Sequence, residues 1–237
     1  MKHIAIILAG GIGSRVGGEM PKQLLPLQDG RSILEHAVDA FEQAFCIDEI
    51  AVVMHSHWLN EAEDIIAKND WKKVTKLIKG GAERWKSSYN AVMAYKDLYE
   101  SDKAGEYCLW FHDCARPFVS QRILASVAEA LEEHPAVTVA VPVTDTLYRV
   151  KENAVISTPQ RSDYMRAQTP QAFRLANIYW AFKRVQEESW SGQDPATDDV
   201  GILRRYQPDV PVYIVPGDES NKKITYKEDL GVEGMNG

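Results

Sequence analysis

Strands and helices alternate along residues 1–143, and this alternation constrains the fold more than any other feature of the sequence. Short apolar or β-branched runs are typical of buried strands, and here each is followed by a segment with the apolar spacing of an amphipathic helix. The expected strands are 3–9, 49–55, 73–81, 107–113 and 136–143, and the expected helices are 32–45, 58–69, 83–99 and 121–134. This order predicts an α/β protein whose mostly parallel sheet lies between two layers of helices.

The alternation fades at Asp145. Residues 145–162 are too polar for another buried strand, and they are predicted to form a hairpin with Glu152 and Asn153 at its turn. A helix is expected at 175–188 and a last strand at 210–217. We therefore expect a single domain over residues 1–237, from which a β-arm projects at about 144–172.

Composition narrows the class of protein. The chain of 237 residues carries a formal net charge of −7, which disfavours a general nucleic-acid-binding protein. No apolar run approaches the roughly 20 residues that span a bilayer, and the N-terminus lacks a signal-peptide pattern. Three scattered cysteines, Cys46, Cys108 and Cys114, fit a reducing compartment. We expect a soluble cytoplasmic protein that binds neither nucleic acid nor membranes.

The first strand runs into a glycine-rich loop, "AGGIGSRVGGEMPK", at residues 9–22. Ligands bind outside the carboxyl ends of parallel strands, and glycines there let backbone N–H groups approach a phosphate. The alternative interpretation is a tight turn in which Gly10, Gly11 and Gly13 supply positive φ angles. The glycines alone leave both interpretations open.

Two familiar phosphate-binding motifs do not fit this loop. A dinucleotide-binding fingerprint fails because Val16 stands in place of its third glycine, and the second strand ends without an acidic residue for a ribose. A P-loop fails because Pro21, and not glycine, precedes Lys22. What remains is a phosphate loop that carries two cations, Arg15 and Lys22.

Other expected strands also end in groups that suit nucleotide chemistry. The third ends at Gly80 and Gly81, which permit close approach of a flat group, and Ser87 follows in the next helix. The fourth ends at Asp113, a position typical of a magnesium carboxylate, or alternatively a cap of the next turn. The segment after the last strand returns Lys223 to the same edge. Such a set suits nucleotidyl transfer, because cations and a divalent metal stabilise the charge on a triphosphate.

Seven motifs occur in the order of a known family. They are "LAGGIGSRVGGEMPKQ", "GGAERWKSS", "HDCARPF", "PVTDT", "RSDYMRAQTPQAF", "TDD" and "NKKITYKEDL". With them the chain resembles the 2-C-methyl-D-erythritol 4-phosphate cytidylyltransferases and their close relatives, the ribitol-5-phosphate cytidylyltransferases. The resemblance implies a Rossmann-like sheet of the nucleotide-diphospho-sugar transferase type, a homodimer with exchanged arms, Mg²⁺ or another divalent cation, and transfer of CMP from CTP to a polyol phosphate.

The same resemblance implies roles for individual residues. The residues expected to act in catalysis are Arg15, Lys22, Arg161 and Lys223. Those expected to bind the nucleotide are Ala9, Gly10, Gly11, Gly13, Gly80, Gly81 and Ser87. Those expected to hold the polyol phosphate are Arg116, Thr146, Arg161 and Thr169, and Asp113 is expected to bind the metal.

The motifs leave the acceptor open between two polyol phosphates. The start "LAGG" at residues 8–11 is closer to the ribitol enzymes, whereas "TDD" at 197–199 is closer to the methylerythritol enzymes. We expect 2-C-methyl-D-erythritol 4-phosphate, in isoprenoid precursor synthesis, with ribitol 5-phosphate as the alternative, giving CDP-ribitol for cell-surface polymers. A non-catalytic nucleotide-binding protein is a distant alternative, because it would be expected to lack a cation or carboxylate of these motifs, and none is missing.

Overall fold

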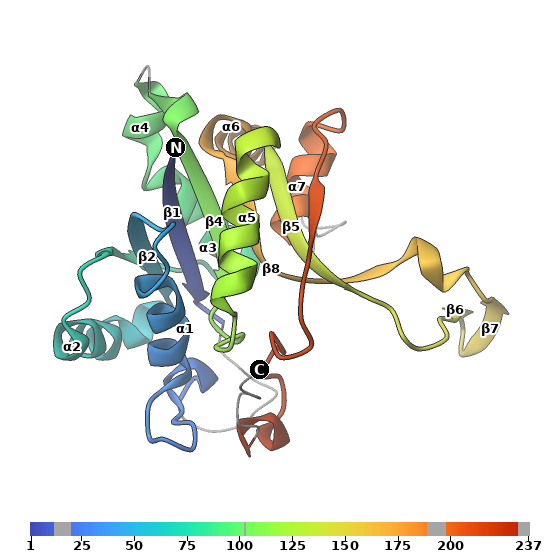
Figure 1. Cartoon of the computed structure of the whole chain (residues 1–237), viewed down its shortest axis with the longest axis horizontal. Coiled ribbons are helices and arrows are strands. Elements are labelled where there is room, and N and C mark those ends of the chain that lie inside the picture. The colour runs from blue at the N-terminus through green and yellow to red at the C-terminus, as the bar shows by residue number, and fades with distance from the viewer. Residues whose placement is uncertain (12–19, 102, 189–197, 232–237) are drawn as a thin grey trace.

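A computed structural model describes residues 1–11, 20–101, 103–188 and 198–231 (Figure 1). Its centre is a seven-stranded sheet in the order β3-β2-β1-β4-β8-β5-β9. The strands are β1 Lys2–Ala9, β2 Glu49–Met54, β3 Val74–Lys79, β4 Tyr107–Asp113, β5 Ala136–Pro142, β8 Met165–Arg174 and β9 Tyr213–Pro216. All neighbouring pairs are parallel except the two that β8 makes, so the predicted mostly parallel α/β sheet is confirmed.

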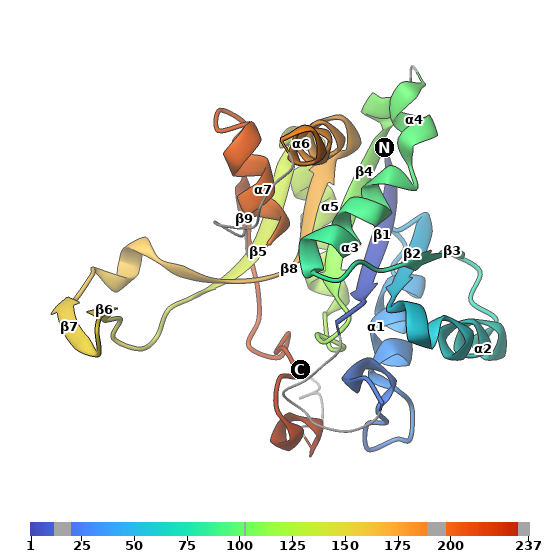
Figure 2. The same cartoon turned by 180° about the vertical axis from the view of Figure 1, so that it is seen from behind.

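Helices cover both faces of this sheet, as Figures 1 and 2 show from opposite sides. They are α1 Ile33–Glu42, α2 Leu59–Asn69, α3 Arg84–Met93, α4 Lys96–Glu100, α5 Gln121–Glu133, α6 Leu175–Glu187 and α7 Asp199–Tyr206. Because strand side chains alternate between the faces, Ala5 and Ile7 of β1 pack in one core with α1, α2 and α5. Ile4 and Ile6 pack in the other core with α3, α6 and α7, which completes the predicted three layers.

Helix boundaries follow local sequence signals. Ser32 begins α1 with a capping box, in which its hydroxyl accepts from the Glu35 N–H and the Glu35 carboxylate accepts from the Ser32 N–H. The helix predicted at 83–99 is divided into α3 and α4. The break falls at Tyr95, whose ring is buried and whose hydroxyl donates to Glu49 at 2.8 Å.

No helix among the described residues is long and apolar enough to cross a membrane.

Two elements, β8 and α7, were not predicted. Residues 165–172, expected to belong to the arm, lie in β8, which runs antiparallel between β4 and β5 in the interior of the sheet. Three of its buried side chains are polar: Gln168, Thr169 and Gln171. A buried strand is predicted from a run of apolar residues, and the polar residues of β8 interrupt such a run.

The hairpin forms as predicted. Strands β6 Arg149–Lys151 and β7 Ala154–Ser157 pair antiparallel, and the turn between them places Glu152 and Asn153 at φ 51° and 64°. Two consecutive left-handed residues are typical of the turns that connect two-residue hairpins. Figures 1 and 2 show this hairpin projecting well away from the sheet, as an arm that leaves after β5 and returns into β8.

Candidate active site

The predicted site residues of four chain segments gather at the carboxyl edge of the sheet, the lower end of β1 in Figure 1. The segments are the ends of β1, β3 and β4 and the chain that follows β9. Direct contacts join them: Lys22, after β1, donates from Nζ to the carbonyl of Ile224 at 2.7 Å. Lys223 contacts Asp113 of β4 at 2.7 Å. The sheet edge therefore brings together residues that are up to 202 positions apart.

The glycines after β1 and β3 pack against each other and against Ser87. A Cβ added to Gly10 would lie 2.9 Å from Ser87 Oγ, and one added to Gly80 would lie 3.2 Å from the Met54 carbonyl oxygen and 3.3 Å from Gly10 Cα. Ser87 Oγ also accepts a hydrogen bond from the Gly81 N–H at 3.1 Å. Two strand ends can approach this closely only where neither carries a side chain.

The backbone angles of Gly10 and Gly11 test one of their two interpretations. Among the described glycines, Gly30 alone has a positive φ, at 82°. The turn interpretation, which required positive φ, is therefore wrong for Gly10 and Gly11. Gly13 and Arg15, the other predicted residues of this loop, lie outside the described residues.

Asp113 is ionised and lies between two cations. Its Oδ1 is 3.3 Å from Arg84 Nε and its Oδ2 is 2.7 Å from Lys223 Nζ. Burial alone would raise the pKa of Asp113, but the positive charges of Arg84 and Lys223 outweigh burial and hold it well below its usual range. The neighbouring Lys222 instead pairs with Asp229, outside this cluster.

The donor set fits a metal that arrives with a ligand. Among the described residues, no group of three or more His, Cys, Asp or Glu side chains is placed to hold an ion. Mg²⁺ is commonly bound by one or two carboxylates together with substrate phosphates and water. The single ionised carboxylate of Asp113 matches this pattern.

Sequence reasoning missed Arg84 and Asp199 as parts of the site. Arg84 is the first residue of α3, and its Nη2 lies 2.9 Å from Oδ2 of Asp199, the first residue of α7. Asp199 is fully buried. Burial would lower the pKa of Arg84, but Asp199 and Asp113 raise it above its usual value, so the guanidinium stays charged. The sequence does contain a signal for both residues: each is a charged residue inside a motif, Arg84 in "GGAERWKSS" and Asp199 in "TDD".

Arg116 ties the segment after β9 to the sheet. Its Nη1 donates to the Asn221 carbonyl at 2.7 Å and its Nη2 donates to the Ala167 carbonyl at 3.3 Å. Asn221 is fully buried and donates from Nδ2 to the carbonyl of Thr169 at 2.8 Å. The structure thus places Arg116 and Thr169 beside the segment that carries Lys223.

His112 and Thr169 form a fixed hydrogen-bond chain behind Asp113. The Arg116 carbonyl, 2.9 Å from His112 Nε2, can only accept, so Nε2 carries the proton of the neutral ring. Thr169 Oγ1 then donates to His112 Nδ1 at 3.1 Å and accepts from the Asp113 N–H at 3.1 Å. This chain fixes the backbone that presents the Asp113 carboxylate.

We expect His112 to make the protein less stable as the pH falls. Burial lowers the pKa of His112 from 6.5 to about 4. Between pH 6.5 and pH 4, His112 is therefore protonated in the unfolded chain and neutral in the folded chain. Stability therefore decreases from about pH 6.5 towards pH 4, by up to about 3 kcal/mol for this group. In urea unfolding at pH 4.5–7.5, His112→Asn should give a flatter pH dependence than the wild type. The exposed His57, changed to Asn, is the control. An unchanged slope in His112→Asn would contradict this assignment.

Thr146 and Arg161 lie on the arm, apart from the carboxyl edge. Both are exposed, and Arg161 donates from Nη1 to the carbonyl of Thr144 at 2.6 Å. Figure 1 shows the arm directed away from the ends of β1 and β4. Within one chain, the structure does not bring these two residues to Asp113.

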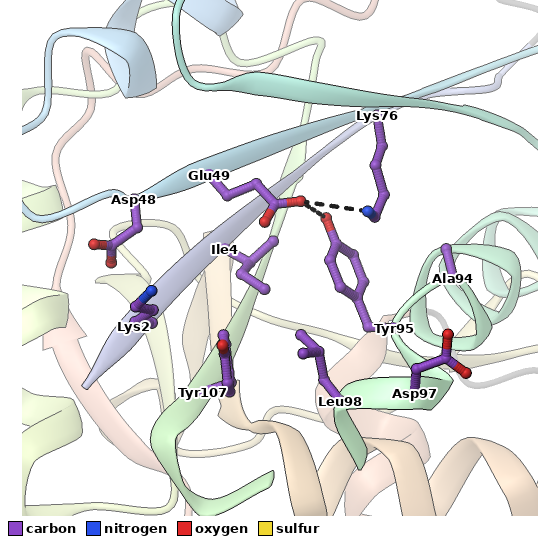
Figure 3. Close-up of a pocket in the computed structure, with 10 residues that line it drawn as sticks. All are labelled: Lys2, Ile4, Asp48, Glu49, Lys76, Ala94, Tyr95, Asp97, Leu98 and Tyr107. Carbon is purple, nitrogen blue, oxygen red and sulfur yellow. Dashed lines mark hydrogen bonds and ion pairs between the residues drawn. The ribbon is translucent and has the colours of Figure 1, made fainter. Parts of the chain in front are cut away.

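A pocket lies at the opposite end of the sheet (Figure 3). Lys2 and Ile4 at the start of β1, Glu49 at the start of β2 and Tyr107 at the start of β4 help to line it. Its polar centre is internally paired, because Glu49 Oε1 accepts from Tyr95 and lies 3.8 Å from Lys76 Nζ. None of the predicted site residues lines this pocket.

Comparison with known proteins shows the family of the chain. A sequence profile described as 2-C-methyl-D-erythritol 4-phosphate cytidylyltransferase matches residues 3–234. The chain belongs to this family. It is thus a nucleotidyltransferase of the cytidylyltransferase class, and the predicted family resemblance is confirmed.

Individual cytidylyltransferase relatives span most of the chain. The chain is 43% identical over 233 residues to the 2-C-methyl-D-erythritol 4-phosphate cytidylyltransferase of Thermobifida fusca, covering 96% of this chain and 90% of that protein. It is 37% identical to a bifunctional ribulose 5-phosphate reductase/CDP-ribitol pyrophosphorylase of Haemophilus influenzae, covering 97% of this chain but 47% of that protein. A solved 4-diphosphocytidyl-2C-methyl-D-erythritol synthase from Anaerococcus prevotii superposes with a TM-score of 0.80 at 28% identity, covering 97% and 92% of the two chains.

Proposed function

We propose that the protein transfers CMP from CTP to 2-C-methyl-D-erythritol 4-phosphate and releases pyrophosphate. Family membership supports this reaction, and one observation of the site carries it. The ionised Asp113 lies between Arg84 and Lys223, at the edge where the glycines after β1 and β3 meet. Nucleotidyl transfer needs a carboxylate that binds a divalent cation and positively charged side chains that bind the phosphates. It also needs backbone groups that the base can approach.

The chemistry needs positioning more than covalent catalysis. A phosphate oxygen of the acceptor attacks the α-phosphorus of CTP, and the bond from that phosphorus to the oxygen bridging to the β-phosphorus breaks. Pyrophosphate leaves with the electron pair of that bond. Lys22 and Arg15 would stabilise the charge that develops on the triphosphate, and Lys223 would orient the attacking phosphate. No enzyme-bound covalent intermediate is required.

Asp113 would hold Mg²⁺ or another divalent cation, which supplies charge neutralisation of the triphosphate when bound. Lys223 contacts the same carboxylate, so it lies within reach of whatever Asp113 binds. The backbone N–H of Gly81 and the hydroxyl of Ser87 would recognise the cytosine. Both belong to the cluster in which Gly10 and Gly80 let the ends of β1 and β3 pack closely together.

The arm would complete the site of a second copy in a homodimer. Thr146 and Arg161 are assigned to the polyol phosphate, yet the arm that carries them projects away from its own sheet edge (Figure 2). Apolar side chains on the arm are exposed in the single chain, namely Tyr148, Val150, Val155, Ile156 and Tyr164. A two-fold dimer would bury such residues and place each arm at the neighbouring site. The cytoplasmic location remains a prediction.

Ribitol 5-phosphate is the second candidate acceptor. One observation favours it: the Haemophilus influenzae relative named CDP-ribitol pyrophosphorylase is 37% identical over almost the whole of this chain. The two acceptors share the terminal phosphate that Lys223 and Arg161 would hold. They differ in the carbon chain that carries this phosphate.

A product assay distinguishes the acceptors. The purified protein is incubated with CTP, Mg²⁺ and either polyol phosphate, and the CDP-alcohol and pyrophosphate are quantified. We expect the higher kcat/KM with 2-C-methyl-D-erythritol 4-phosphate. A higher value with ribitol 5-phosphate would reverse the choice of acceptor, and no product with either would contradict cytidylyl transfer to these polyol phosphates.

The same assay tests the base. A site that hydrogen-bonds the cytosine edge leaves its own polar groups unpaired when another base is buried there, at a cost of several kcal/mol. We therefore expect CTP to be used at least about a hundredfold better than ATP. Equal kcat/KM values for the two nucleotides would contradict a base site at Gly81 and Ser87.

A further inference from the structure

Asp113 shares Arg84 with a second carboxylate, that of the buried Asp199. Arg84 contacts Asp113 through Nε at 3.3 Å and Asp199 through Nη2 at 2.9 Å. The contact with the fully buried Asp199 is the shorter of the two. The guanidinium therefore lies between the two carboxylates: it forms an ion pair with Asp199 and donates a hydrogen bond from Nε to Asp113 Oδ1.

Asp199 is itself held in place from the sheet. Gln171 of β8 accepts through Oε1 from the backbone N–H groups of Asp199 and Val200, at 3.1 and 3.2 Å. Its Nε2 donates to Asp198 Oδ2 at 2.8 Å, and Asp198 Oδ1 caps α7 by accepting from the Gly201 N–H. The backbone at the start of α7 is thus tied to the central strand, and the buried Asp199 carboxylate forms its ion pair with Arg84.

Arg84 also belongs to the loop expected to bind the base. It follows Gly80, Gly81 and Glu83 directly and begins α3, the helix that carries Ser87. A single side chain therefore connects the base loop, the end of β4 and the start of α7. Its fork geometry lets it contact two carboxylates at once, which a lysine ammonium does less well.

We propose that Arg84, anchored by Asp199, is a positioning residue that sets the Asp113 carboxylate relative to the base loop. Asp199 limits how closely Arg84 can pair with Asp113. The carboxylate consequently keeps a cationic partner that fixes its orientation and yet remains able to accept a divalent cation. This inference rests on the proposed function.

Three variants separate positioning from stability. Asp199→Asn preserves the shape of the side chain but releases Arg84 to move towards Asp113. Arg84→Gln leaves Asp199 as an unpaired buried charge, so it should lower the stability strongly. In the double variant no buried charge is left unpaired. We expect its stability to recover relative to Arg84→Gln, while its kcat/KM stays low.

The losses of kcat/KM in the two single variants are not expected to add up in the double variant. Partners that orient a metal-binding side chain typically affect affinity or activity by about 10- to 100-fold. We expect about a tenfold loss of kcat/KM in each single variant, and about the same tenfold loss, not a hundredfold one, in the double variant. Arg84→Lys should recover stability by pairing with Asp199 but should not restore kcat/KM. The matched control is the exposed pair Arg122 and Asp218, 3.6 Å apart, changed to Gln and Asn.

A second readout needs no turnover. Binding of Mn²⁺ in the presence of CTP, without an acceptor, is measured for the same variants by electron paramagnetic resonance. We expect weaker Mn²⁺ binding in Asp199→Asn, with urea unfolding close to that of the wild type. Three results would each overturn the proposal. The first is wild-type kinetics and wild-type Mn²⁺ binding in Asp199→Asn. The second is a loss of kcat/KM in the double variant equal to the product of the two single losses, and the third is an Arg84→Lys variant that recovers kcat/KM together with stability. Absence of product from the wild type would contradict the proposed function alone, because the Mn²⁺ titration would still report on Arg84.

Discussion

Changing Asp113 to Asn is expected to abolish turnover while leaving the chain folded. Asn has almost the same shape, but it lacks the charge that a divalent cation needs. Even groups that only orient metal ligands affect activity by about 10- to 100-fold, so loss of the ligand itself should reduce kcat at least about a hundredfold. Pyrophosphate release at saturating CTP, acceptor and Mg²⁺ measures this.

The structure also predicts what Asp113→Asn leaves intact. Arg84 keeps its ion pair with Asp199, and Lys223 is released towards the phosphates. CTP binding in the absence of acceptor, measured by calorimetry, should therefore fall much less than kcat. Asp70→Asn is a matched control, because Asp70 also pairs with a lysine, Lys72, but is exposed and distant in the chain. More than about a hundredth of wild-type kcat in Asp113→Asn would contradict the metal assignment.

The parallel part of the fold was predictable because its strands are buried on both faces. Residues 3–9 and 107–113 are nearly continuous apolar runs, and each precedes a helix with a clear apolar stripe. Such runs are typical of strands covered by helices on both sides. The structure places β1 and β4 side by side with these residues in its two cores.

Strand β8 could not be predicted in the same way, because its buried residues are chosen for hydrogen bonding. Gln168 bonds to the backbone of Asp218 and to Asn221, and Gln171 holds the start of α7. Thr169 completes the chain from His112 to the Asp113 backbone. These contacts are made between segments distant in sequence, and no local pattern reveals them. The polar residues that hide the strand are the ones that organise the site.

The candidate site was predictable wherever a residue stands at a strand end. Asp113, Gly80 and Lys223 were found on this basis, and the structure places all three at one edge. Arg84 and Asp199 were missed because each begins a helix, where a charged residue has an ordinary role as a solvated end. Only the fold shows that α3 and α7 begin close enough for these charges to pair.

Two inactive variants are expected to restore activity when their chains are mixed. In the proposed dimer, Lys22 acts in the site of its own chain, whereas Arg161 acts in the site of its partner. Lys22→Ala and Arg161→Ala should each be nearly inactive alone. In a mixed dimer, one site receives both substitutions and the other site receives neither.

The size of the recovery follows from random pairing. After the two variants are refolded together in equal amounts, about half of the dimers are mixed, and each mixed dimer has one intact site of two. Roughly a quarter of wild-type activity should therefore return. Mass measurement of tagged chains verifies that mixed dimers have formed, and each variant refolded alone serves as the control. If Lys22 and Arg161 of one site came from one chain, every site of a mixed dimer would carry a substitution and no activity would return. The recovery thus decides whether the arm, exposed and directed away from its own sheet edge, serves the site of a second copy.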